Sequence, residues 1–401
     1  MDLKERALRT SMINRGEPCG LQEQAFELHQ KGPGKISTEL TVSLENKEDL
    51  SLAYTPGVAA VSSEIAQHPE MVYDYTIKGH TVAIVTDGSA VLGLGDIGPE
   101  AAMPVMEGKA ALFKHFAGLD AFPLCLAERD VEAIIRIVKA IVPTFGGVNL
   151  EDIGAPRCFA IEDALQDVGI PVMHDDQHGT AVVVLAGLIN AAKVAGKDMS
   201  SLRVVISGAG AAGSAIARLL ASRVADILMI DSKGIIYEGR ADLDEYKKKW
   251  ANITNKGKKQ GSLRDALAGA DVFIGVSKAN LLGADDVKTM AAKAIIFAMA
   301  NPNPEIMPEE AKAGGAYVIA TGRSDYPNQV NNVLSFPGLF KGALESRAKK
   351  ITDEMKTAAA EALAALVQNP TVDKIIPGPF DPGVVDAVAE AVKKVANTQH
   401  E

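Results

Sequence analysis

The sequence has few of the residues that mark secreted or membrane proteins. Its three cysteines, Cys19, Cys125 and Cys158, lack the spacing of a metal site and cannot form an even disulfide framework. No apolar stretch reaches about 18 residues without interruption, so we expect no membrane span. The N-terminus is charged and lacks the apolar segment of a signal peptide. These absences predict a cytoplasmic protein.

Basic residues are also in the minority. Asp and Glu number 51 against 41 Lys and Arg, which gives a formal net charge of −10. Nucleic acids and anionic membrane surfaces are bound by basic patches, so we expect neither as a partner. Aromatic residues make up 5% of the chain and apolar residues 47%, as in ordinary α/β proteins. The 401 residues suffice for two or three domains with large cores.

From about residue 80, short apolar runs alternate with polar turns and helical stretches. The runs are TVAIVT, DAFPLCLA, GGVNL, IPVMH, LRVVIS, DILMI, DVFIGVS, AIIFAMA and AYVIAT. This alternation predicts an α/β fold with parallel strands buried on both faces. We expect an N-terminal α/β catalytic domain over residues 1–176 and a C-terminal Rossmann-like, doubly wound domain over 177–401. Residues 1–30 read as helical, and the tail reads as two amphipathic helices over 345–369 and 381–401.

One segment, LRVVISGAGAAGSAIARLL, has glycines in G-x-G-x-x-G spacing. The glycines follow a predicted strand and open a predicted helix, the context in which the spacing indicates a dinucleotide site rather than a tight turn without a ligand. The residues expected at the cofactor are Gly208, Gly210, Ala211, Ala212 and Gly213, with Ser277 after a later strand. The strand that follows the glycines ends at Asp231, about twenty residues on, where a carboxylate would bind ribose hydroxyls.

The choice between NAD and NADP is less clear from the sequence. Asp231 favours NAD, because its charge opposes a 2′-phosphate. Ser232 and Lys233 come next and could hold that phosphate. We expect NAD or NADP, with a slight preference for NAD.

Pairs of acids stand where two predicted strands end. Glu151 and Asp152 follow one strand, and Asp175 and Asp176 follow the next. Two like charges at ~4 Å cost on the order of 4 kcal/mol at an effective dielectric of ~20, so converging acids would take up protons or bind a cation. Oxygen ligands favour Mg²⁺ or Mn²⁺ over zinc. A single acid at such a place is more often a helix cap or a loop charge than a metal ligand, but the acids taken together favour a metal site.

These motifs resemble those of malic enzymes of the short bacterial type. The similarity extends over almost the whole chain. The matching segments are LSLAYTPGVA, TVAIVTDGSAVLGLGDIGPEAAMPVMEGKA, NLEDI, HDDQHGTA, GAGAAG, FAMANPNPE and NQVNNVLSFPG. The resemblance implies oxidative decarboxylation of L-malate to pyruvate and CO₂, with a nicotinamide cofactor and Mn²⁺ or Mg²⁺.

The resemblance also implies roles for particular residues. Tyr54 takes the place of the general acid and Lys109 that of the base. The matches to the metal ligands are Glu151, Asp152 and Asp176. The matches to residues near the substrate carboxylates are Asn301, Asn331 and Asn332.

Three expectations accompany these roles. A base must be neutral, so we expect burial and the metal charge to depress the pKa of Lys109. We expect Asp96 to orient Lys109. Longer family members carry a substrate-binding arginine where this chain has Ala90, which leaves open the cation that meets the substrate carboxylate.

Other functions share parts of this pattern. Malolactic conversion of malate to lactate would use similar motifs, and an inactive nucleotide-binding regulator would need only the glycines. An amino-acid dehydrogenase would not need the acidic cluster.

Amphipathic helices at the termini need a surface to cover, so we expect a homodimer.

Overall fold

The computed structural model describes residues 20–32 and 34–398. Its first sheet has four parallel strands in the order β2-β1-β3-β4. The strands are β1 (Thr81–Thr86), β2 (Asp120–Cys125), β3 (Gly147–Leu150) and β4 (Val172–His174). Every residue of β1, β3 and β4 is buried, as expected for parallel strands covered on both faces. The helices of this part are α6 (Pro99–Leu112), the π-helical segment η3 (Phe113–Ala117), α7 (Val131–Ile141) and α8 (Arg157–Ala164).

The second sheet has six strands in the order β10-β9-β8-β5-β6-β7. The strands are β5 (Arg203–Ser207), β6 (Asp226–Asp231), β7 (Gly234–Ile235), β8 (Val272–Gly275), β9 (Ile295–Ala298) and β10 (Val318–Thr321). All nine predicted strands therefore exist and are parallel to their neighbours; β7, which the sequence did not reveal, is two residues long and antiparallel to β6. The helices around this sheet are α10 (Ala211–Leu220), α11 (Glu245–Ile253), α12 (Leu263–Leu267), α13 (Ala284–Lys288) and α14 (Pro308–Ala313). The expected fold of two parallel α/β units is confirmed.

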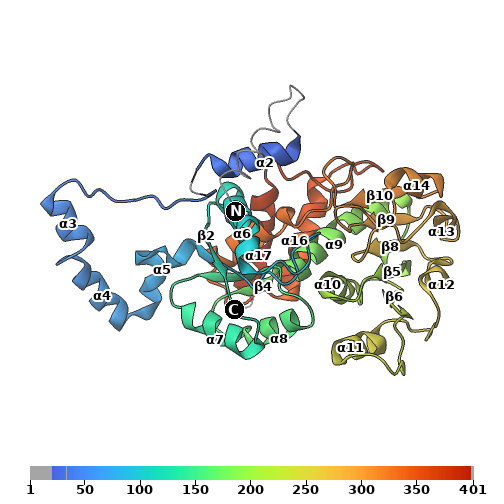
Figure 1. The fold of residues 1–401 in the computed structure, drawn as a ribbon, viewed down its shortest axis with the longest axis horizontal. Coiled ribbons are helices and arrows are strands. Elements are labelled where there is room, and N and C mark those ends of the chain that lie inside the picture. Colours follow the sequence, from blue (N-terminus) through green and yellow to red (C-terminus); the bar gives the residue numbers. More distant parts are fainter. Residues whose placement is uncertain (1–19, 33, 399–401) are drawn as a thin grey trace, which may run out of the picture.

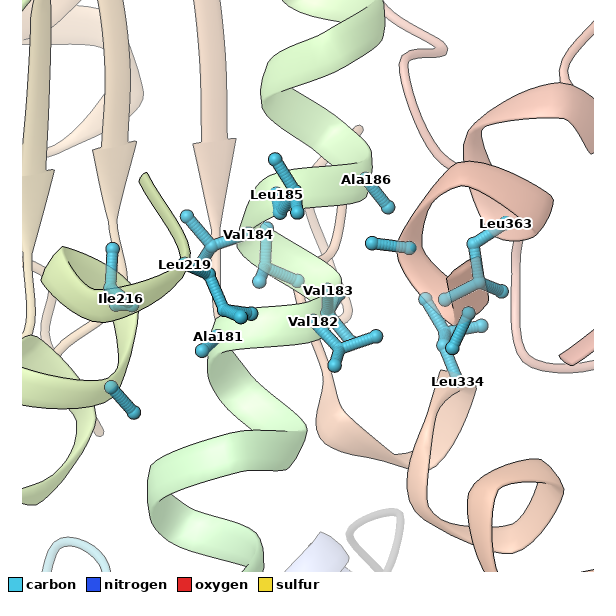
Figure 2. Close-up of a cluster of buried hydrophobic side chains, with 14 of the residues drawn as sticks. Ala181, Val182, Val183, Val184, Leu185, Ala186, Ile216, Leu219, Leu334 and Leu363 are labelled. Atoms are coloured by element: carbon cyan, nitrogen blue, oxygen red, sulfur yellow. The ribbon is translucent and has the colours of Figure 1, made fainter. Parts of the chain in front are cut away.

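A long helix, α9 (Asp175–Ala195), connects the two sheets. Its residues Ala181–Ala186 lie between Ile216 and Leu219 on one side and Leu334 and Leu363 on the other (Figure 2). The helix has the length and composition of a membrane span, but 78% of its most apolar 18-residue window is buried inside the protein. Packing of α9 between α10 and the C-terminal part of the chain therefore accounts for its hydropathy.

Both helices expected in the tail are present, as α16 (Asp353–Leu366) and α17 (Val384–Thr398). A further helix, α15 (Phe336–Glu345), precedes them and follows the 3₁₀ turn η5 (Asn332–Leu334). Phe336 and Phe340 of α15 pack on Phe113 of η3, with ring centroids 4.8 and 5.5 Å away. The tail thus packs on the first sheet's helices as well as on α9, and the expected division at residue 176 stays a prediction.

An N-terminal arm precedes the first sheet. It contains α2 (Leu21–Gln30), α3 (Lys47–Ala53), α4 (Val58–Gln67), η1 (Pro69–Met71), α5 (Val72–Tyr75) and η2 (Ile77–His80). Helix α2 confirms the described part of the helix expected over residues 1–30, and residues 1–19 lie outside the described chain. Asn46 caps α3 by accepting hydrogen bonds from Glu48 N (2.8 Å) and Asp49 N (2.9 Å). Helices α3 and α4 project away from both sheets (Figure 1).

Candidate active site

The acidic pairs meet at the carboxyl end of the first sheet. Glu151 and Asp152 directly follow β3, while Asp175 and Asp176 open α9 directly after the neighbouring strand β4. One carboxylate oxygen from each of Glu151, Asp152 and Asp176 lies within 4.8 Å of the other two. Asp152 adopts a left-handed φ of 52°, and its N–H donates to Asp176 Oδ2 at 2.8 Å. The structure therefore brings together the three acids that the resemblance assigned to a metal.

Crowding changes the charge of these acids. Burial, together with the charges of Asp176 and Glu151, raises the pKa of Asp152 to about 9. Burial also raises the pKa of Glu151, and it raises the pKa of Asp176 to about 6. Acids that resist ionisation in this way are stabilised by a bound cation. Because the donors are all carboxylate oxygens, the cluster fits a hard divalent ion such as Mg²⁺ or Mn²⁺.

Lys109 of α6 lies against this cluster. Its Nζ is 2.9 Å from Glu151 Oε1, donates a hydrogen bond to Asp175, and lies 4.1 Å from the centroid of the Phe336 ring. Burial lowers the pKa of Lys109, but the charges of Asp175 and Glu151 outweigh burial and raise it. Without a metal the pKa of Lys109 is thus raised, and its depression by burial together with a metal charge stays a prediction.

Asp175, rather than Asp96, orients Lys109. Asp96 is paired with Arg129, whose Nη1 lies 2.6 Å from Asp96 Oδ2 on the surface, so the expected role of Asp96 is wrong. Asp175 Oδ2 accepts hydrogen bonds from both Lys109 and Asn332. Consecutive residues of a helix point about 100° apart, which explains why Asp175 meets Lys109 while Asp176 joins the acidic cluster.

The three asparagines differ in their surroundings. Asn332 contacts Asp175, as described above. Asn331 Oδ1 accepts a hydrogen bond from Val333 N at 3.0 Å and caps η5, which gives it a structural role. Asn301 follows β9 and lies near Gly93, in the loop between β1 and α6 of the first sheet. A Cβ added to Gly93 would lie 3.5 Å from the Asn301 carbonyl oxygen. The structure thus places Asn301 where the two domains meet.

Buried polar residues that the sequence did not reveal support the cluster. Asn149 Nδ2 donates to Glu151 Oε2 at 2.7 Å. Glu162 of α8 accepts hydrogen bonds from His174 N (3.0 Å) and Gln177 Nε2 (2.9 Å), and it lies 3.0 Å from His178 Nε2. Both histidines are buried, and His174 Nδ1 lies 3.8 Å from Asp176 Oδ2. A buried glutamate in a short helix gives no signal in a single sequence.

The position of the missing arginine lies beside the acids. Ala90 N donates to the carbonyl oxygen of Asp152 at 2.9 Å. A guanidinium contacts the same loop: Arg157 Nη2 donates to Ser89 Oγ at 2.8 Å, and its Nη1 lies 2.7 Å from Asp87 Oδ2.

The glycine-rich turn lies at the carboxyl end of the second sheet, between β5 and α10. Gly208 has a φ of 115°, and a Cβ at Gly213 would lie 1.8 Å from the Gly208 carbonyl oxygen. A Cβ at Gly210 would meet no described atom within 4 Å, so a ligand could approach this backbone closely. Ala211 and Ala212 open α10, with their N–H groups at its N-terminus. The geometry has the features of a turn that binds a pyrophosphate.

A cavity of about 730 Å³ extends from this turn. Its walls include Ser207, Gly208, Gly210, Asp231, Lys233 and Ser277 from the second domain, and Ala155, Pro156 and Phe159 from the first. The expected cofactor residues Asp231 and Ser277 therefore line one cavity between the domains. Asp231 accepts hydrogen bonds from Arg240 Nη2 (2.6 Å), Lys247 Nζ (3.2 Å) and Lys233 N (3.0 Å).

Tyr54 is the one expected site residue on the projecting arm. It ends α3, and 67% of its surface is exposed. Figure 1 shows α3 far from α6, which carries Lys109. The structure does not bring Tyr54 to the other site residues of its own chain.

Family models match both halves of the chain. Residues 33–166 match "Malic enzyme, N-terminal domain", and residues 177–398 match "Malic enzyme, NAD binding domain". The chain belongs to the malic enzyme family. The resemblance of the sequence motifs to this family is thereby confirmed.

Individual relatives agree with this assignment. A bifunctional malic/malolactic enzyme of Bacillus subtilis is 58% identical, covering 94% of this chain and 93% of the relative. An NADP-dependent malic enzyme of Halomonas elongata is 46% identical over 94% and 93%. The crystal structure of an NAD-dependent malic enzyme from Thermotoga maritima is 52% identical and superposes with a TM-score of 0.90, covering 92% of this chain and 98% of the other.

Proposed function

We propose that this chain catalyses oxidative decarboxylation of L-malate to pyruvate and CO₂, with a divalent metal and a nicotinamide cofactor. The observation that carries the proposal is the contact of Lys109 with Glu151, a member of the three-acid cluster. Glu151, Asp152 and Asp176 would hold Mn²⁺ or Mg²⁺. When bound, the ion supplies a Lewis acid for the oxygens of the substrate.

Lys109 and Tyr54 move the protons of the reaction. Malate loses its hydroxyl proton and a hydride from C2, and then CO₂ from C3, and Lys109 receives the hydroxyl proton. Because two carboxylates hold Lys109 as an ammonium, it must first release a proton, and Asp175 Oδ2 is an acceptor in contact with it. Tyr54 then gives a proton to C3, which releases pyruvate as the ketone.

Polar side chains position the substrate. Neutral amides add no charge beside the acids, which suits Asn301 and Asn332 to contact with the substrate carboxylates. Asn331 acts with them through the turn that it caps. Arg157, which contacts the residue next to Ala90, is the cation that we propose in place of the missing arginine.

NAD is the cofactor that we propose as preferred. The carboxylate of Asp231 lines the cavity, where it would bind ribose hydroxyls and repel a 2′-phosphate. Arg240 and Lys247 reduce this repulsion, since both contact the same carboxylate. We therefore expect NADP to bind, but more weakly than NAD.

Malolactic conversion is the second candidate. It is favoured by the Bacillus subtilis relative, which is named as a bifunctional malic/malolactic enzyme. In that reaction the hydride returns to pyruvate, so lactate forms without net reduction of the cofactor.

The protein would act as a homodimer in the cytoplasm, with neither nucleic acid nor membrane as a partner.

Steady-state kinetics with malate, each cofactor, and Mn²⁺ or EDTA test the proposal. We expect equal amounts of NADH and pyruvate with Mn²⁺, and no turnover in EDTA until excess Mn²⁺ is added. Lactate without NADH would identify the malolactic reaction instead. Undiminished turnover in EDTA would contradict a role for the metal.

A further inference from the structure

The site described above is incomplete in a single chain. Decarboxylation leaves an enolate whose C3 needs a proton, and the general acid assigned to that step is Tyr54. Tyr54 ends α3, is 67% exposed, and lies on an arm that projects away from α6 (Figure 1). A tyrosine hydroxyl in solvent cannot protonate an intermediate held beside Lys109.

The arm itself lacks a partner surface. Among the described residues of α3 and α4, none is buried. The apolar side chains that the arm exposes include Leu40, Val42, Leu44, Leu50, Leu52, Val58 and Val61. Monomeric proteins seldom leave so many apolar side chains together in water, and such a surface usually marks an interface between proteins.

A complementary apolar surface borders the acidic site. Met103 and Val105 of α6 are exposed one to two turns before Lys109, and Leu92 and Leu94 are exposed in the loop between β1 and α6. The arm leaves the body beside this surface, because Lys35 N donates to Glu107 Oε2 at 3.1 Å. An apolar surface next to a catalytic lysine needs a cover that excludes water.

We propose that the arm of each subunit packs on a second copy of this chain, so that Tyr54 of the partner subunit completes the site that contains Lys109. The partner is a second copy of this chain because the arm carries Tyr54, the general acid that the site around Lys109 lacks. A two-fold axis exchanges both arms at once and covers both apolar surfaces in one closed dimer. This inference rests on the proposed function, since it assigns Tyr54 to the same reaction.

Mixed dimers of two inactive variants test the exchange. Tyr54→Phe and Lys109→Ala are purified with different tags, mixed, unfolded and refolded together, and the dimer carrying both tags is isolated. If Tyr54 acts in the partner's site, this dimer has one site with both residues intact. Its turnover should be about half that of the wild-type dimer. Lys109→Ala mixed with Lys109→Met is the matched control and should stay inactive.

The outcomes separate this inference from the proposed function. A wild-type protein inactive with malate would reject the proposed function. An active wild type, with inactive single variants and an inactive mixed dimer, would reject only the exchange and place Tyr54 in its own chain's site. Full activity of Tyr54→Phe would also overturn the inference.

Sedimentation equilibrium tests the interface independently. Leu52→Glu places a charge on the exposed apolar side of α3, so the protein should become monomeric and lose turnover while still binding NAD. Tyr317→Glu alters an exposed side chain just before β10, the edge strand of the second sheet, and should stay dimeric. An active Leu52→Glu monomer would contradict the exchange.

Discussion

The two sheets present different chemistry at the same topological position. In each sheet the chain continues to opposite sides from two neighbouring central strands, β1 and β3 in the first sheet and β5 and β8 in the second. Parallel α/β sheets bind ligands at the carboxyl ends of such strands. The first sheet places side-chain charges there, with Lys109 and the acids buried in contact. The second places a glycine-rich turn and a helix N-terminus there. Buried charges suit proton transfer and metal binding, whereas open backbone suits a large anionic cofactor.

Replacing Lys109 should have the largest effect on turnover. It should also distinguish most clearly between the site on the first sheet and the cofactor turn on the second. We expect Lys109→Ala to lower kcat by about 10²–10⁴-fold because the hydroxyl proton loses its acceptor. The dissociation constant of NAD, measured by fluorescence titration, should hardly change. The control is Lys114→Ala, an exposed lysine of the adjoining helical segment that pairs with Asp120. An unchanged kcat would remove Lys109 from the mechanism.

A substitution in the glycine-rich turn should have the converse effect. The Cβ of Gly213→Ala would lie 1.8 Å from the Gly208 carbonyl oxygen and must push α10 away from β5. We expect the KM for the cofactor to rise roughly 10–100-fold, since small displacements at a binding turn have large effects. Mn²⁺ affinity should be unaffected. Gly257→Ala, which meets no described atom within 4 Å, is the control.

Asp231 should affect the choice of cofactor rather than the reaction. In Asp231→Ala the ribose hydroxyls lose an acceptor, and Arg240 and Lys247 become available to a 2′-phosphate. We expect kcat/KM to fall about tenfold for NAD and to be maintained or to rise for NADP. Asp242→Ala removes another partner of Arg240 and should change the ratio little. A larger loss with NADP would show that the assigned preference is wrong.

The smallest expected effect is on the pH dependence of thermal stability with and without Mn²⁺. The pKa of Asp176 is raised from 3.8 to about 6 and that of Asp152 from 3.8 to about 9, so the folded chain binds these protons more tightly than the unfolded chain. Their contribution to the free energy of unfolding is therefore most favourable at low pH, and it is lost as the pH rises through each folded-state pKa. Mn²⁺ should raise Tm by a few degrees more at pH 8 than at pH 5. The same Mn²⁺ effect at both pH values would contradict this linkage, and Asp152→Asn should reduce the difference.

The sequence predicts the framework because each strand is a short run of buried β-branched or apolar residues. It also predicts that Glu151 and Asp152 meet the Asp175–Asp176 pair, since parallel strand ends share one edge. Spacing alone could not separate Asp175 from Asp176, because their difference comes from helix rotation; only the family resemblance selected Asp176. Nor could it show that Arg240 reaches Asp231 across a polar loop, a contact set by tertiary structure.

Motif similarity likewise identifies Tyr54 without locating it. The motif states which residue serves as the acid, whereas its position depends on how the arm packs. The contact of Lys109 with Asp175, which raises the pKa of the lysine in the absence of a metal, was likewise not visible in the sequence.

Anomalous diffraction from crystals soaked in Mn²⁺ tests the central claim most directly. We predict one strong peak among the carboxylates of Glu151, Asp152 and Asp176, and its loss in Asp176→Asn. Side chains turned toward separate surroundings, with no peak between them, would contradict the metal site and the reaction built on it.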